Sequence, residues 1–343
     1  MLYVTTRNNR DAYTAHRAMA ECRGPDGGLY VPFREPRFTP EEIRAFSENT
    51  FNTAVAEILN RLAGTKLTGW DVDLAIGRYA VRMEKLGQRV MVAECFHNLE
   101  ADFSGIVRIL SDQLAASAQL APGCWSEIAV RIAVLFGIFG ELMRRELAGE
   151  DNPVDIAVVS GDFAAPISAW YARQWGLPIG NIVCACNDNG QLWDFICHGQ
   201  FKSGELAVCT NTPEADVVVP VHMERLIYGC AGAAEVARYL EAVRRGSNYY
   251  VSDALLQKIR QGIYVTVSSQ RRVKETVSRV YGSYGHILSP YTALSFAGLQ
   301  DYRARTGESR RALVLAEKSP LRDVLTVSDA LGITEETLKT YLQ

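Results

Sequence analysis

Asp155-Ile156-Ala157-Val158-Val159-Ser160-Gly161-Asp162-Phe163 is a short apolar run that ends in a polar, glycine-containing turn. A run of this length and composition is typical of a buried strand in a parallel sheet. Three similar runs follow it, separated by helical patterns, at residues 181–185, 262–267 and 312–316. The alternation predicts an α/β fold with a central sheet and helices on both faces.

The chain before this segment has mainly helical patterns. Thr39-Pro40-Glu41-Glu42 combines an N-cap threonine, a proline at the first helical position and two acids in the first turn. Apolar periodicity predicts further helices within residues 55–62 and 74–85. We therefore expect a helical region over residues 1–90 and an α/β core over residues 91–343.

The amino-acid composition limits the classes of partner that we expect this protein to bind. The 343 residues are 48% hydrophobic, which is enough for a large core, and a net charge of −3 gives no electrostatic footprint for nucleic acid or an anionic membrane. The longest apolar run, residues 132–140, is far shorter than a membrane span and predicts a buried helix. We expect neither nucleic acid nor a membrane as a partner.

The eight cysteines are spread along the chain without a dense spacing pattern, and the N-terminus has no secretory pattern. We expect the cysteines to be reduced and the protein to be cytoplasmic. Cys184 and Cys186 flank Ala185 in a predicted strand, which is not the usual zinc spacing, so the sequence predicts core packing and no metal site.

Ordered motifs along almost the whole chain resemble the threonine synthase family. They match the family patterns YxSTRG, PDGGLYVP, ELFH, SGNFG, FERLLF and DPHTA, and stand here as Tyr3-Val4-Thr5-Thr6-Arg7, Pro25-Asp26-Gly27-Gly28-Leu29-Tyr30-Val31-Pro32, Glu94-Cys95-Phe96-His97, Ser160-Gly161-Asp162-Phe163, Met223-Glu224-Arg225-Leu226 and Pro290-Tyr291-Thr292-Ala293. The resemblance implies a tryptophan-synthase-β-like sheet, that of fold type II pyridoxal phosphate (PLP) enzymes. By family, it also implies PLP as cofactor.

Four departures from the family fall on its chemistry. Ser104 stands where the family has the lysine that forms the Schiff base, and a hydroxyl cannot form an imine. Asp162 and Ala164 interrupt the turn that holds the phosphate, and Glu317 replaces the hydroxyl that meets the pyridine nitrogen. A segment of the small domain has no counterpart between Phe103 and Trp125, so we expect a truncated small domain.

The resemblance places the candidate residues just after the predicted strands. Because the carboxyl ends of parallel strands lie at the same edge of a sheet, we expect these residues to lie close together. His97, Ser104 and Glu317 are the candidate catalytic residues, and the candidate ligand-binding residues are Asn98, Asp162, Asn187 and Lys318. Alternative roles remain for two of these residues. His97 is alternatively a partly buried structural histidine. Lys318 alternatively forms a simple ion pair, or it forms a Schiff base itself.

These departures predict a degenerate member that has lost PLP binding and threonine synthase activity. We expect it to bind a small molecule, with anions among the candidates, or a protein partner. Two alternatives remain: a PLP-independent enzyme that reuses the cleft in specialised metabolism, and a PLP-dependent lyase that holds the cofactor non-covalently. A monomer and a homodimer are equally compatible with the resemblance.

Overall fold

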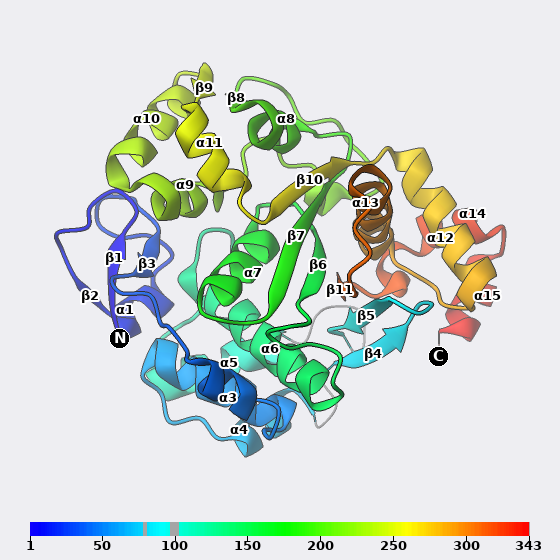
Figure 1. The fold of residues 1–343 in the computed structure, drawn as a ribbon, viewed down its shortest axis with the longest axis horizontal. Coiled ribbons are helices and arrows are strands. Elements are labelled where there is room, and N and C mark those ends of the chain that lie inside the picture. The colour runs from blue at the N-terminus through cyan, green and yellow to red at the C-terminus, as the bar shows by residue number, and fades with distance from the viewer. Residues whose placement is uncertain (78–80, 97–102, 343) are drawn as a thin grey trace.

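The computed structural model describes residues 1–77, 81–96 and 103–342, and in them a six-stranded sheet of order β10-β7-β6-β11-β5-β4 forms the centre (Figure 1). Five strands run parallel, and β4 pairs antiparallel with β5 at one edge. All four predicted strands are confirmed. The strands are β4 Arg82–Lys85, β5 Val90–Glu94, β6 Val154–Val159, β7 Ile179–Cys186, β10 Ile263–Val267 and β11 Ala312–Ala316.

Helices cover both faces of this sheet, as predicted. Helix α7 (Ala164–Gln174) packs on β6 and β7, and α6 (Trp125–Arg144) packs against α7. Helix α13 (Pro290–Thr306) covers the opposite face, with α12 (Gln270–Tyr284) against it. Successive side chains of a strand point to opposite faces. In β11, Leu313 and Leu315 therefore join one hydrophobic cluster, and Val314 joins the other.

The N-terminal region also contains a small antiparallel sheet of order β2-β1-β3, which the sequence did not predict. Helix α2 begins at Pro40 after the N-cap Thr39, as expected from the sequence. Thr39 and Glu42 also form a capping box. The elements of this region are β1 Leu2–Thr5, β2 Tyr13–Thr14, α1 Ala15–Ala20, β3 Tyr30–Pro32, α2 Pro40–Ala45, α3 Phe51–Ala63 and α4 Gly69–Ile76.

The expected helix over residues 74–85 is wrong. Helix α4 ends at Ile76, because the next residue, Gly77, has a positive φ of 83°. Arg82–Lys85 is instead the edge strand β4, whose backbone pairs with β5. Its side chains do not form the core pattern of a strand, so only the tertiary pairing reveals it.

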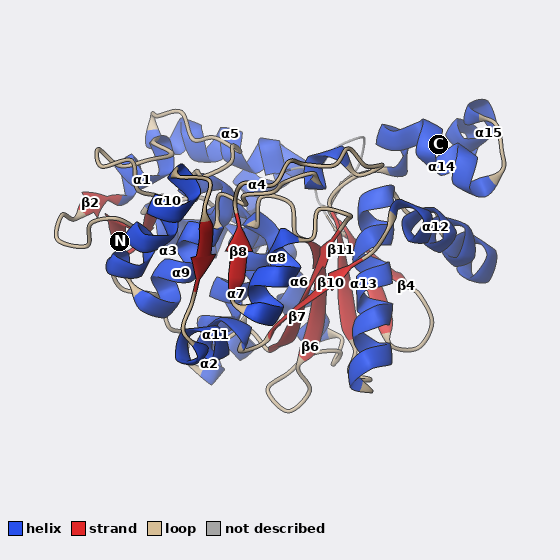
Figure 2. Ribbon diagram, turned by 90° about the horizontal axis from the view of Figure 1, so that it is seen from above, coloured by secondary structure: helices blue, strands red, loops and turns tan. Residues whose placement is uncertain are grey.

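The remaining elements complete the layers, and the chain termini lie on opposite sides of the molecule (Figure 2). The apolar run 132–140 lies in α6 and is buried, as predicted, and among the described helices none is long and apolar enough to cross a membrane. These elements are α5 Phe103–Leu114, α8 Gln191–His198, β8 Gln200–Lys202, η1 Pro213–Ala215, α9 Met223–Ala231, α10 Ala233–Arg244, β9 Asn248–Tyr250, α11 Asp253–Arg260, η2 Pro320–Asp323, α14 Val324–Leu331 and α15 Glu335–Tyr341.

Cys22 and Cys124 form a disulfide, which corrects the expectation that all cysteines are reduced. The two residues are 102 positions apart in the sequence, and Cys124 is the N-cap residue of α6. Their spacing gave no signal because the fold, rather than the sequence, brings them together. Cys184 and Cys186 are buried in β7, as expected for core residues.

Candidate functional site

A cavity of about 420 Å³ lies at the carboxyl ends of β6 and β11. These two strands are parallel neighbours in the sheet, so the residues that follow them meet at one edge. Its walls include the apolar side chains of Val158, Val217 and Leu315. The described acidic and basic residues that line it are Glu127, Arg131, Asp162, Glu214, Glu317 and Lys318. We call this space the strand-end cavity.

The turn after β6 forms one wall of the strand-end cavity. Phe163 N–H donates to Ser160 O at 2.7 Å, and Phe163 itself adopts a left-handed backbone with φ of 73° at the N-cap of α7. The Asp162 carboxylate folds back, and its Oδ1 accepts the Ala164 N–H at 2.9 Å. An amide at the N-terminus of α7 is therefore already bonded to an anion that belongs to the chain.

Arg131 links α6 to the end of β11. Its Nη1 pairs with Glu317 Oε1, and its Nη2 lies 3.3 Å from Glu127 Oε1. Burial by itself would lower the pKa of Arg131, but the attraction of Glu317 and Glu127 outweighs burial and raises the pKa above its ordinary value. Glu317 is thus held in an ion pair and does not stand free in the cavity.

Lys318 is also paired. Its Nζ forms an ion pair with Glu214 and lies 5.4 Å from the ring centre of Tyr291, within the range of a cation–π contact. Burial raises the pKa of Tyr291, which therefore stays neutral. Glu317 and Lys318, although adjacent in sequence, pair with different partners.

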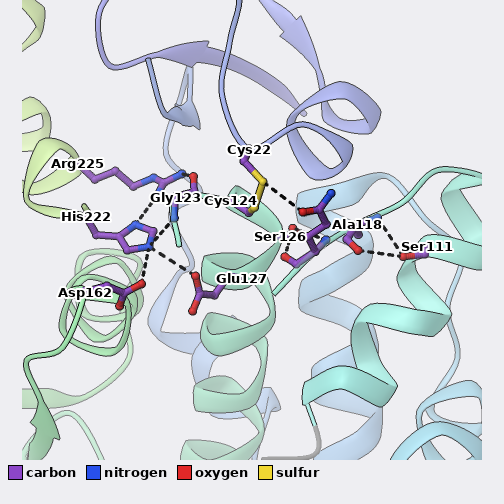
Figure 3. The surroundings of a disulfide bond; sticks show 11 residues. Cys22, Ser111, Ala118, Gly123, Cys124, Ser126, Glu127, Asp162, His222 and Arg225 are labelled. Atoms are coloured by element: carbon purple, nitrogen blue, oxygen red, sulfur yellow. Dashed lines mark hydrogen bonds and ion pairs between the residues drawn. A yellow bond between two sulfur atoms is a disulfide. The ribbon is translucent and has the colours of Figure 1, made fainter. Parts of the chain in front are cut away.

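His222 is fully buried beside the cavity and faces two of its carboxylates (Figure 3). Its Nε2 is 3.6 Å from both Asp162 Oδ2 and Glu127 Oε2, and its Nδ1 contacts Arg225 Nη1. Burial, and then the charge of Arg225, lower the pKa of His222 well below its ordinary value. His222 is therefore a neutral imidazole at neutral pH.

The structure brings three of the predicted site residues together and separates two others. Asp162, Glu317 and Lys318 line the strand-end cavity. Ser104 is exposed in the first turn of α5 and is not among the described lining residues. Asn187 is buried away from this lining and donates to Thr210, Thr212 and Asp216. His97 and Asn98 lie outside the described residues.

Sequence reasoning missed Glu127, Arg131 and His222. A signal for the first two was present, because they are an acid and a base spaced i,i+4 just before the apolar run of α6. Charged residues are rarely buried beside such a run without a specific role. His222 gave no local signal, because its neighbours Asp162 and Glu127 come from distant parts of the chain.

Comparison with known proteins agrees with this fold and with the resemblance in sequence. Residues 2–78 match the family "Threonine synthase N terminus". The chain is 24% identical to human "Threonine synthase-like 1" over 202 residues, which cover 57% of this chain and 26% of that protein. It is 26% identical to the threonine synthase of Eremothecium gossypii over 227 residues, covering 61% of this chain and 43% of that enzyme.

These relatives are longer than the matched part: the alignments span about a quarter of the human protein and under half of the fungal one. Among solved structures, PLP-bound threonine synthase from Brucella melitensis superposes with a TM-score of 0.87 at 18% identity, covering 100% of this chain and 94% of that one. Yeast threonine synthase gives a TM-score of 0.83 at 14% identity, with 99% and 93% covered. The expected fold type II architecture is confirmed.

Proposed function

Since the chain is related to threonine synthases in sequence and has their fold, we propose that it binds a small molecule in the strand-end cavity without PLP and does not make threonine. The observation that carries the proposal is the Asp162 carboxylate on the Ala164 N–H. By family, amides of this turn hold the cofactor phosphate.

The contacts around the cavity oppose PLP binding at both the phosphate end and the ring end of the cofactor. A phosphate at the turn would compete with Asp162 for an amide and would stand beside its charge, at a cost of about 1 to 4 kcal/mol for unit charges at contact distance. At the other end, Glu317, in the place of the family's ring partner, is engaged by Arg131. Ser104 offers no amine and does not line the cavity.

The shape of the cavity supports retained binding of a small molecule. A concave space of about 420 Å³, with apolar walls and a few convergent polar groups, is within the size range of small-molecule sites. Buried carboxylates and an arginine are costly to desolvate, so their convergence on one cavity is more typical of a binding site than of a hydrophobic core.

The test is the absorbance spectrum of the purified protein with added PLP, beside Ser104→Lys and Ser104→Lys/Asp162→Asn. We expect neither the wild type nor the single variant to show bound cofactor, because the turn still carries Asp162. The double variant should bind more PLP, since it also removes the charge. Tight PLP binding by the wild type, or threonine formation from phosphohomoserine, would overturn the proposal.

A further inference from the structure

Three groups from distant parts of the chain meet at the wall of the strand-end cavity: Glu127 on α6, Asp162 after β6 and His222 before α9. One ligand atom from each lies within 4.8 Å of the others. The Glu127 side chain is only 10% exposed, and its buried Oε2 has no hydrogen-bond partner among the described residues. A buried carboxylate oxygen without a partner is costly, which indicates that a ligand satisfies it.

Arg225 determines which ring nitrogen of His222 carries the hydrogen. Its guanidinium is held by Tyr30 O at 3.1 Å and Gly123 O at 3.0 Å, and it can only donate. The Nδ1 of neutral His222 must therefore accept from Arg225, and Nε2 carries the hydrogen. The Gly123 N–H, 3.3 Å from Nε2, cannot then donate to it; the charged contact with Arg225 is the stronger of the two.

The Nε2–H of His222 does not satisfy the two carboxylates that it faces. Both oxygens, Glu127 Oε2 and Asp162 Oδ2, are 3.6 Å away, which is beyond hydrogen-bond length. The free acceptor capacity at this wall therefore belongs to two carboxylate oxygens close to one another.

The charged residues that line the cavity also indicate a ligand at Glu127 and Asp162. Its described lining holds four carboxylates and two basic groups. Lys318 pairs with Glu214, and Arg131 pairs with Glu317 and with Oε1 of Glu127. Arg322 adds a second cation to Glu214. Among the described residues, Oδ2 of Asp162 and Oε2 of Glu127 have only the neutral His222 within ion-pair distance, so the uncompensated negative charge is local to these two oxygens. A cationic ligand group would neutralise this charge, whereas an anionic group would add to it.

A protonated amine fits this wall better than a metal ion. A metal would need the lone pair of His222 Nε2, which is protonated while Arg225 occupies Nδ1. An ammonium group needs only acceptors, and the two carboxylate oxygens supply them.

We propose that Glu127 and Asp162 bind the ammonium group of a small primary amine whose apolar part packs against Val158, Val217 and Leu315. This inference rests on the proposed function, because it names the class of molecule for the same cavity. It changes the expectation from an anionic ligand to a cationic one.

The test is calorimetric titration with benzylamine and with benzyl alcohol, which share an apolar body and differ in charge. We expect the amine to bind the wild type at least about tenfold more tightly than the alcohol, as for a charge-assisted contact. Asp162→Asn and Glu127→Gln should each remove most of this difference and leave the alcohol unchanged. Glu336→Gln, at an exposed position of α15, is the control and should behave as wild type.

The outcomes separate this inference from the proposed function. Equal binding of the two probes would overturn the ammonium site but leave a small-molecule cavity, and binding of neither probe would also overturn it. Stoichiometric binding of Zn²⁺ that Asp162→Asn abolishes would assign the wall to a metal and overturn the inference. PLP binding is measured separately and decides the proposed function. A thermal melt of each variant confirms that it is folded.

Discussion

Arg131 Nη1 donates to Glu317 Oε1, and this ion pair joins the N-terminal half of α6 to the residue that follows β11. The two side chains are only 17% and 20% exposed, so most of their hydration is lost. The pair closes one wall of the strand-end cavity and holds two elements that are 186 positions apart in the sequence.

Replacement of Arg131 by methionine leaves Glu127 and Glu317 without their cation. We expect the free energy of unfolding to fall by about 2 to 4 kcal/mol, slightly less than for a fully buried pair. Urea denaturation measures the loss. Arg131→Met/Glu317→Leu should lose less than the sum of its single variants. A change below about 0.5 kcal/mol in Arg131→Met would contradict a stabilising role.

His222 should make the protein less stable in mild acid. Its pKa in the fold lies below the unfolded value of 6.5, so the unfolded chain binds the proton first, and stability falls as pH drops below about 6.5. Arg225, Arg131 and Arg23 oppose protonation, and Asp162 favours it. We expect the slope to grow from about 0.7 kcal/mol per pH unit at pH 6.5 toward about 1.4 kcal/mol per pH unit about one unit lower, measured by urea unfolding at several pH values.

The control is His222→Gln, which keeps an acceptor for Arg225 but does not titrate. Its stability should depend less on pH between about pH 6.5 and 5.5 than that of the wild type. Identical slopes for the two proteins would show that His222 does not carry the effect.

The disulfide should contribute measurably to stability. Because Cys22 and Cys124 close a long loop, their link restricts the unfolded chain, and Cys22→Ser should lower the free energy of unfolding by about 2 to 5 kcal/mol. Dithiothreitol should reproduce this loss in the wild type and have no further effect on the variant. If the reductant left the wild-type unfolding midpoint unchanged, the prediction would fail.

Gly140 should tolerate no side chain. A Cβ there would lie 2.6 Å from the backbone oxygen of Phe46, so Gly140→Ala should destabilise the fold by about 1 to 3 kcal/mol. Gly282 in α12 is the matched control, because nothing lies within 4 Å of its Cβ position. Gly282→Ala should raise stability by up to about 1 kcal/mol through helix propensity. Thermal unfolding of both variants checks the opposite signs.

The sequence predicted those features that depend on local pattern. The strand runs after residue 155, the N-cap at Thr39 and the buried helix around 132–140 all follow from periodicity and capping chemistry. Strand β4 was missed because three of its four side chains are charged and its existence depends on pairing with β5. A single sequence contains no direct signal of such pairing.

The site was predictable only in part, for the same reason. Asp162, Glu317 and Lys318 were placed by motif and lie together. Arg131, which pairs with Glu317, and His222, which faces Asp162, come from other elements and became visible only in the fold.

The Cys22–Cys124 link makes a covalent ring of the chain between these residues, and the ring includes strands β4 and β5 of the central sheet. A single cut in the exposed turn at Gly87 would open the ring without releasing either fragment. In its oxidised form, the nicked protein would remain one covalent body, with its two pieces joined by the disulfide beside the start of α6 and the cavity wall (Figure 3). Reduction would then leave the two pieces held only by their packing.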